Sequence, residues 1–182
     1  MKDYPFINKN GKQRPQSKEW SDIRAEIMQL KTELNLNDAE FRALSPYEDH
    51  QGIEETIYQN FCQFEDRRNR PIWLWLSFKQ EVYSTDFLPE APESYLPTLI
   101  DPTETIWLGA LGSMQEKSKI WFYEGQILPI QKVLSEIQFF DEFYFVSKKY
   151  EWLICINHHD TLIATGGEMP KRLKMLCESL RG

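Results

Sequence analysis

Apolar residues in the first part of the chain recur at the three- and four-residue spacing of an amphipathic helix. A first helix is predicted from Ser17, a residue that suits the N-cap position. Its apolar face consists of Trp20, Ile23, Ile27, Leu30 and Leu34. Another helix is predicted over 51–66, with Ile53, Ile57, Phe61 and Phe64 as its apolar stripe. Residues 17–80 therefore indicate a helical part of the fold.

Two shorter segments of this helical part have less regular patterns. Asn37 followed by Glu40 has the spacing of a capping box, which predicts a short helix. That helix would bury Phe41 and Leu44. Residues 71–80 alternate Trp and Leu, as a strand does, but begin with a proline, which suits the first turn of a helix. We favour a helix for this segment, with a strand as the alternative.

From residue 105 onward, short apolar runs separated by turn residues predict an antiparallel sheet. Strands are expected at 105–112, 118–125, 142–149, 152–157 and 161–167. A crossover helix is expected at 126–137 and a terminal helix at 169–180. Helices followed by strands argue for an α+β fold, with N-terminal helices packed on a C-terminal sheet (105–182) of about five strands. The length favours a single domain over 1–182.

Residues 81–104 have a different composition, with six acidic residues, no basic residue and four prolines. Proline at this density disfavours both helices and sheet ladders, so a long surface loop is predicted. Loops of this length are commonly functional. Tyr83 and Tyr95 are candidate binding residues, since exposed aromatic side chains often dominate the binding energy of a protein interface.

The charge and cysteine content narrow the classes of function. A net charge of −7 repels phosphate backbones, which argues against nucleic-acid binding and favours a basic protein partner. Cys62, Cys155 and Cys177 are far apart, so neither a disulfide framework nor a zinc site is expected. No apolar stretch resembles a signal peptide or a membrane span. We therefore expect a cytoplasmic protein that does not contact membranes.

The polar segment Asn157-His158-His159-Asp160 between two expected strands is the main candidate for chemistry. Strand alternation would place His158 on the side of Ile156 and His159 on the opposite side, so the two rings should diverge and not share a metal ion. No metal ligand is therefore assigned. A hairpin turn is one interpretation, because Asn and Asp favour turns. Recognition is a second. Catalysis is a third, with Asp160 orienting a histidine.

A nucleophile for such catalysis is not evident in the sequence. Ser147 and Thr161 are the nearest candidates, but no nucleophile motif surrounds them. No catalytic residue is assigned, and no cofactor is expected. Lys148, Lys149 and Tyr150 form the other turn of the same strand pair. This turn is either a solvated hairpin or a small basic patch for a carboxylate or phosphate, and it should lie at the opposite end of the strands from the histidines.

The run FYFVSKKYEWLICINHHD, from Phe143 to Asp160, resembles a small bacterial family of unknown function. The shared pattern is an aromatic strand, then S-K-K-Y-x-W-L, then N-H-H-D, and the resemblance spans roughly 105–165. In size and context such families resemble immunity proteins encoded beside toxins. The resemblance supplies no catalytic residues. It implies that the positions most worth testing are Lys148, Lys149, Tyr150, Trp152, His158, His159 and Asp160.

These observations together predict a non-enzymatic cytoplasmic protein-interaction module, with an immunity-type inhibitor of a toxin as its specific form. The acidic segment would steer a basic partner toward the surface. The alternative is a small hydrolase or a ligand sensor that uses the turn His158-His159-Asp160.

Overall fold

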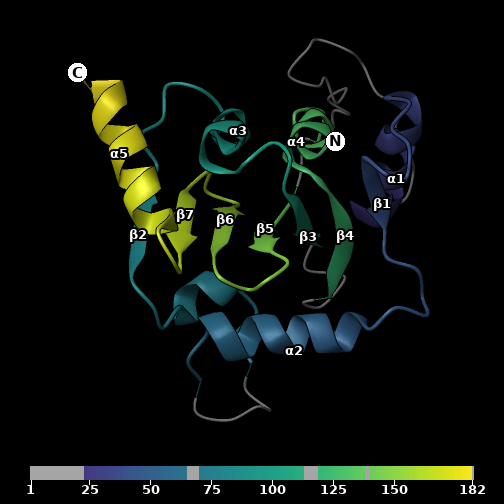
Figure 1. Ribbon diagram of the computed structural model, residues 1–182, viewed down its shortest axis with the longest axis horizontal. Coiled ribbons are helices and arrows are strands. Elements are labelled where there is room, and N and C mark those ends of the chain that lie inside the picture. Colours follow the sequence, from purple (N-terminus) through teal and green to yellow (C-terminus); the bar gives the residue numbers. More distant parts are fainter. Residues whose placement is uncertain (1–22, 65–69, 113–118, 138–139, 182) are drawn as a thin grey trace, which may run out of the picture.

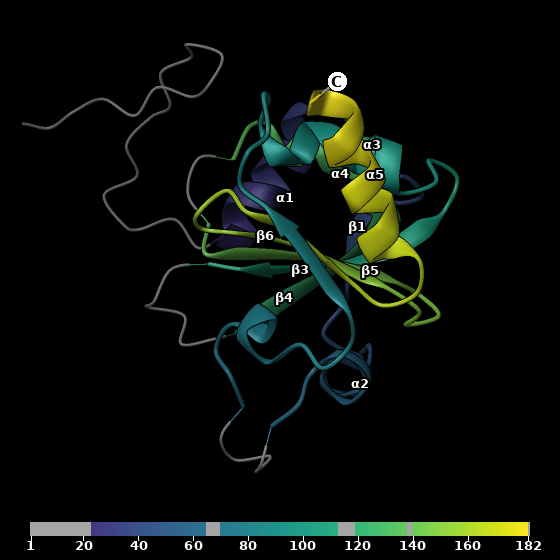
Figure 2. The ribbon, with the colours of Figure 1, turned by 90° about the vertical axis from the view of Figure 1, so that its left-hand side faces the viewer.

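The computed structural model describes residues 23–64, 70–112, 119–137 and 140–181. These residues build a seven-stranded antiparallel sheet with helices on both faces (Figures 1 and 2). The strand order is β1-β4-β3-β5-β6-β7-β2. The α+β class expected from the sequence is therefore confirmed, with two more strands than the five that were predicted.

The strands are β1 (Phe41–Ala43), β2 (Val82–Thr85), β3 (Thr105–Leu111), β4 (Ile120–Gln126), β5 (Glu142–Ser147), β6 (Leu153–Asn157) and β7 (Leu162–Thr165). The α-helices are α1 (Ile23–Glu33), α2 (His50–Phe61), α3 (Leu96–Leu99), α4 (Ile127–Leu134) and α5 (Met169–Arg181). Two short 3₁₀ helices are η2 (Leu74–Ser77) and η3 (Pro92–Tyr95).

The sheet separates two hydrophobic clusters. Figures 1 and 2 show α1, α3, α4 and α5 on one face, here called the four-helix face, and α2 with η2 on the other, here called the α2 face. Each central strand contributes side chains to both clusters, because successive side chains of a strand point to opposite faces. Phe143 and Phe145 of β5 lie in the cluster of the four-helix face, whereas Tyr144 and Val146 lie in that of the α2 face. Both faces are therefore covered, which explains why the central strands are almost continuously apolar.

Several predicted elements are confirmed with small shifts in their bounds. Strand β3, the crossover helix α4, the pair β5 and β6 and strand β7 lie within their expected ranges, while β4 and α5 each extend one residue beyond theirs. Helix α2 begins after Asp49, whose carboxylate accepts a hydrogen bond from the Gly52 amide at 2.8 Å, and it ends at Phe61. The predicted N-cap Ser17 and the apolar residue Trp20 of the first helix lie outside the described residues.

The helix predicted from Asn37 is wrong, although its capping hydrogen bonds form. The Asn37 amide donates to the Glu40 carboxylate at 3.0 Å, and the Glu40 amide donates to Asn37 Oδ1 at 3.1 Å. The chain makes only one turn before Phe41 enters β1 and pairs with Gly125 of β4. Phe41 is fully buried, as predicted, and its ring stacks on Tyr123 at 5.4 Å between centroids. Burial in the sheet therefore outweighs the local helix signal.

The helix favoured for 71–80 is largely wrong, since only the 3₁₀ turn η2 forms there. The prediction of 81–104 as a continuous loop is also wrong. That segment contains β2, η3 and α3, because β2 forms an edge strand and prolines occupy the first turns of the two short helices. Among the described residues, no helix is both long and apolar enough to cross a membrane.

Candidate functional site

Glu142, the first residue of β5, carries a carboxyl group that is fully buried on the α2 face. Trp75 of η2 donates its indole N–H to Oε1 at 3.1 Å. His158 Nδ1 lies 3.1 Å from the same oxygen, and Cys155 of β6 donates its thiol to Oε2 at 3.1 Å. These four residues are called the Glu142 cluster below. One buried acid thus joins η2, β6 and the turn between β6 and β7.

The electrostatics of the Glu142 cluster follow from its burial. Burial raises the pKa of Glu142 above its usual 4.5, while the hydrogen bonds from Cys155, Trp75 and His158 oppose that rise. Burial likewise raises the pKa of the Cys155 thiol well above its usual value. The thiol therefore stays protonated and donates a hydrogen bond to Glu142. The nucleophilic form of cysteine is the thiolate, which this high pKa disfavours.

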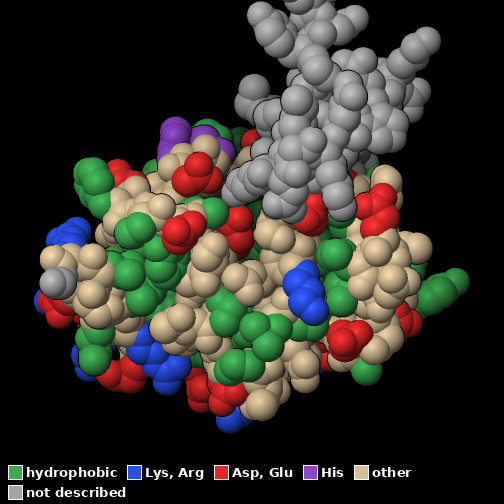
Figure 3. Space-filling view, turned by 90° about the horizontal axis from the view of Figure 1, so that it is seen from above, with side chains coloured by type: hydrophobic (Ala, Val, Ile, Leu, Met, Phe, Trp, Pro, Cys, Tyr) green, Lys and Arg blue, Asp and Glu red, His purple; other side chains and the backbone are tan. Residues whose placement is uncertain are grey.

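The two histidine rings do not diverge, so that prediction is wrong. The ring centroids of His158 and His159 are 4.0 Å apart, with the planes tilted by 47°. The Trp73 ring lies 5.1 Å from His158. Figure 3 shows histidine side chains gathered at one rim of the molecule. Strand alternation fails here because β6 ends at Asn157, so His158 turns toward the Cys155 side of the sheet.

The segment from Asn157 to Asp160 forms the predicted four-residue turn. Asn157 Oδ1 accepts the amides of His159 and Thr161, each at 3.0 Å. The Asp160 amide donates to the Asn157 carbonyl at 2.9 Å, and Asp160 has a φ of 56°. Asn and Asp favour such geometry through side-chain bonds to backbone and tolerance of positive φ. The turn interpretation is therefore confirmed as local structure.

The carboxylate that contacts His158 is Glu142 and not Asp160, the residue that the catalytic interpretation named for orienting a histidine. This contact occupies Nδ1 of His158, whose side chain is 29% exposed. The candidate nucleophile Ser147 lies at the other end of β5, where its hydroxyl accepts the Glu151 amide at 2.9 Å. Within the described ranges, no group of three or more His, Cys, Asp or Glu side chains has an arrangement that could hold a metal ion.

The 3₁₀ turn η2 is held against the sheet by one buried and one part-buried polar contact. Tyr144 of β5 accepts the Leu74 amide on its hydroxyl at 3.1 Å, and Trp75 bonds to Glu142. Burial raises the pKa of Tyr144 well above its usual value, so the hydroxyl remains protonated. The alternating Trp and Leu residues of this segment thus serve to cover the sheet.

The turn with Lys148, Lys149 and Tyr150 lies at the opposite end of β5 and β6 from the histidines, as predicted. Lys148 Nζ contacts the Glu124 carboxylate at 2.6 Å and stands over the Trp107 ring at 4.1 Å. Tyr150 adopts a φ of 57° and packs on the cluster of the α2 face. Lys149 is exposed.

Neighbouring residues extend this pattern of internal contacts. Trp152, next in the predicted pattern, is buried in the cluster of the four-helix face. Arg42 of β1 also pairs with Glu124, and it forms two hydrogen bonds of 2.9 Å with Glu48. This pairing lowers the pKa of Glu48 to about 2. Lys148, Tyr150 and Trp152 are thus engaged in internal contacts.

The acidic segment forms an outer edge of the sheet. Phe87 is 80% exposed and Val82 is 43% exposed. Glu81, Asp86 and Glu90 are exposed beside them, and no ion pair within the described part of the chain involves these three carboxylates. Residues 81–90 are called the acidic edge below. They combine exposed negative charge with two exposed apolar side chains.

The two predicted binding tyrosines lie differently from expectation. Tyr95 is only 9% exposed, belongs to the cluster of the four-helix face, and accepts the Glu90 amide on its hydroxyl at 3.1 Å. The prediction that Tyr95 is an exposed aromatic residue is therefore wrong, because η3 directs its side chain into the core. Tyr83 is partly buried against the same cluster. The exposed aromatic residue is instead Phe87, which nothing in the local sequence distinguishes from its buried neighbours.

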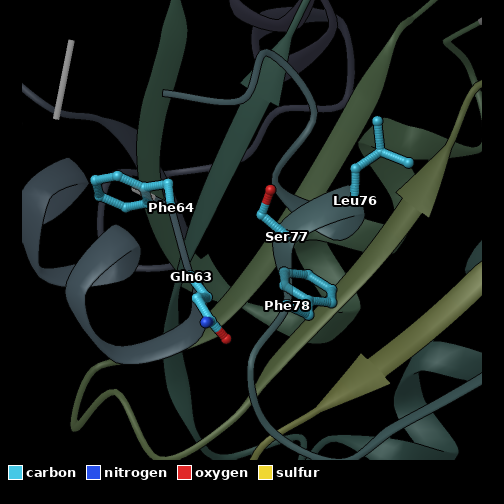
Figure 4. A pocket seen from close by; sticks show the side chains of 5 residues that line it. All are labelled: Gln63, Phe64, Leu76, Ser77 and Phe78. Carbon is cyan, nitrogen blue, oxygen red and sulfur yellow. The ribbon is translucent and has the colours of Figure 1, made fainter. Parts of the chain in front are cut away.

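A surface pocket of about 420 Å³ lies between the end of α2 and η2 (Figure 4). It is lined by Gln63, Phe64, Leu76, Ser77 and Phe78. Its walls are fixed by a 2.7 Å bond from the Gln63 amide to the Ser77 carbonyl. Leu76 is 61% exposed. The lining contains no titratable side chain, so this pocket offers contact area and not acid–base chemistry.

Comparison with known proteins yields one family. The pattern of a family of unknown function (DUF6756) matches residues 19–177. No curated protein and no solved structure matches the chain.

Proposed function

We propose that this chain, which belongs to the DUF6756 family of unknown function, is a protein-interaction module for a basic partner and catalyses no reaction. The observation that carries the proposal is the acidic edge, where Val82 and Phe87 are exposed among exposed carboxylates. Exposed apolar side chains supply buried area in a complex, and the surrounding charge steers a partner of opposite sign.

The specific form that we propose is an immunity-type inhibitor. Toxins that act on anionic substrates need a basic binding surface, and an acidic protein surface can occupy it. The net charge of −7 and the absence of basic residues between 81 and 104 fit such a role. The test is to express each toxin-like gene found beside the gene for this chain, with and without it, and to measure growth. Growth arrest that this chain never relieves would refute the inhibitor role.

Reversing two charges of the acidic edge is expected to weaken partner binding by at least about tenfold. The variant is Glu81→Lys with Asp86→Lys, and binding is measured at low and at physiological salt. Its matched control is Glu33→Lys with Glu151→Lys, which changes the net charge equally at exposed positions on α1 and between β5 and β6. The partner is first isolated from the native host on the wild-type protein and then purified.

The control pair should leave the affinity within about twofold of wild type, since attraction between charges farther apart than about 8–10 Å is screened at ordinary salt. Phe87→Ala should mainly accelerate dissociation of the complex, because the partner would lose the apolar contact with this exposed ring. Equal weakening by the acidic-edge pair and by the control pair would show that only the total charge matters.

The second candidate function is a small hydrolase or a ligand sensor at His158, favoured by the contact between His158 and buried Glu142. Under the interaction proposal, His158→Gln should lower the free energy of unfolding by about 1 kcal/mol, because Glu142 loses one hydrogen bond. His159→Gln, the matched control, should change it by less than about 0.5 kcal/mol. Neither variant should alter partner binding.

The rival function is tested with the same variants. Wild type and both variants are assayed against ester, phosphate and peptide substrates and in a thermal-shift screen of small molecules. A turnover or a ligand-induced rise in melting temperature that His158→Gln removes, while the variant remains folded, would establish the rival function.

A further inference from the structure

The structure points to a specific mode for the proposed interaction: we infer that the partner adds an extended basic segment to the outer edge of β2, as a further strand of the sheet. This inference depends on the proposed function, because it names how the acidic edge would be used. It goes beyond charge attraction, since main-chain hydrogen bonds would provide the contact.

The first argument is the position of β2 in the sheet. Its four residues pair with β7 from Val82↔Thr165 to Thr85↔Leu162, and β2 is the last strand in the order. In Figure 2, β2 is the broad teal arrow in the foreground, with no described segment in front of it. Every second residue of an edge strand directs its N–H and C=O away from the sheet. These groups are available to another chain.

The second argument is that β2 lacks most of the features that protect edge strands. Natural edges commonly carry lysine, proline or a bulge that prevents pairing. No lysine or proline occurs in 82–85, and the pairing with β7 runs without interruption. The other edge strand, β1, has only three residues, and its Arg42 is held by ion pairs to Glu48 and Glu124. The two edges of the sheet therefore differ in how readily they can accept a strand.

The third argument is the alternation of side chains along β2. Tyr83 and Thr85 point inward, while Val82 and Ser84 are exposed. A strand added outside β2 would extend this alternation, with its apolar residues beside Val82. On the other side of the strand, Glu178 and Arg181 of α5 act on the Tyr83 hydroxyl with opposite sign. The dominant local charge therefore comes from the two ends of β2.

The fourth argument decides between a second copy of this chain and a different, basic partner. Antiparallel self-pairing centred between Tyr83 and Ser84 would place Glu81 opposite Asp86 twice. A parallel arrangement would place each acid beside its own copy. Like charges in such positions destabilise a ladder. A segment with Lys or Arg at the same positions would instead gain attraction, so the charges disfavour a second copy in these two registers and favour a basic partner.

The test uses the full chain and a capped, fluorescent peptide, Lys-Thr-Thr-Val-Val-Lys, whose lysines would lie opposite Glu81 and Asp86. Two analogues carry N-methyl groups, one on the second and fourth residues and one on the third and fifth. Neighbouring residues of a strand direct their amides to opposite sides, so only one analogue loses the amides that face β2. Binding is measured by fluorescence anisotropy at low salt.

The expected result is unequal behaviour of the two analogues. One should bind about tenfold more weakly than the parent, and the other within about threefold, because only one set of amides is used. A peptide with glutamate in place of both lysines should not bind. Hydrogen exchange of the segment containing 82–85 should slow when the parent peptide binds, and that of α2 should not.

Failure of this inference is distinguishable from failure of the proposed function. Equal binding of both analogues, or no binding of the parent peptide while the isolated partner still depends on Glu81 and Asp86, would overturn strand addition and leave the proposed function intact. A partner that binds equally well to the variant with both acids changed to lysine would overturn the two together.

Discussion

Replacing Glu142 by alanine is expected to lower the free energy of unfolding by about 2–4 kcal/mol at neutral pH. The carboxyl group accepts the Trp75 indole N–H and the Cys155 thiol, and it faces His158 Nδ1. Alanine would leave the buried Cys155 thiol and the part-buried Trp75 indole N–H without this acceptor, and it would open a cavity at a fully buried position. The measurement is urea denaturation of both proteins at one pH, followed by Trp fluorescence.

Glu142→Gln is the matched control, because its amide oxygen can still accept from Trp75 and its volume is almost unchanged. Its free energy of unfolding should fall by less than half as much as that of the alanine variant. A change in the Trp fluorescence of the folded protein, seen in the alanine variant and not in Glu142→Gln, would show that η2 has detached, since η2 carries Trp75. Equal stability of the alanine variant and wild type would refute the structural role of the buried acid.

The same pair of proteins tests the sign of the electrostatic effect. Burial raises the folded-state pKa of Glu142 above 4.5, so folding favours the protonated form. The corresponding stabilisation is complete below the unfolded pKa and is lost as the pH rises through the folded-state pKa. Glu142→Gln cannot titrate, so its stability relative to wild type should increase with pH across that window. Burial also raises the pKa of the neighbouring Asp141, and the difference between the two proteins cancels most of its contribution.

The elements that the sequence predicts correctly are those whose evidence is local. Helix α4 buries Ile127, Ile130 and Val133 at the expected spacing, and β5 and β6 are apolar runs bounded by turns. The spacing and the apolar runs each lie within one short window of the sequence. The turn at Asn157 was predictable for the same reason, because its hydrogen bonds join residues at most four positions apart.

The edge strands were missed because their evidence is not local. Phe41 follows a genuine capping box, and only its pairing with Gly125 of β4 makes it part of a strand. Val82 to Thr85 lie in an acidic, proline-containing segment, and their strand exists through pairing with β7. Propensity cannot report a partner that lies eighty residues away in the chain.

The chemistry of the histidine turn was mispredicted for a related reason. The geometry of alternating side chains applies only while the chain remains extended, and β6 ends one residue before His158. The acid that meets His158 starts the neighbouring strand, and the donor Trp75 lies 67 residues from Glu142. A charged residue at the head of the apolar run EFYFVS was the available signal for Glu142. Buried acids usually have partners, but the sequence does not identify them.

Gly166→Ala is expected to lower the free energy of unfolding by about 2–4 kcal/mol. Gly166 has a φ of +80°, and a Cβ there would lie 2.7 Å from the Glu151 carbonyl oxygen and 3.1 Å from the Trp152 Cα. Both contacts are with backbone atoms of the turn between β5 and β6, which cannot rotate away as a side chain can. Relief would require the connection from β7 to α5 to move away from that turn.

Gly167→Ala separates the conformational cost from the collision. Gly167 also has a positive φ, of +51°, but a Cβ there would meet only the Glu151 carbonyl, at 3.3 Å. Its loss should be about 1 kcal/mol, because only the left-handed conformation is penalised and the unfolded chain also loses freedom. Thermal and urea denaturation of the two variants measure the difference. Similar losses at both positions would mean that backbone conformation alone sets the requirement for glycine. A markedly larger loss at Gly166 would mean that the close approach of two turns, fixed by the sheet, also helps to hold α5 beside the edge strand β2.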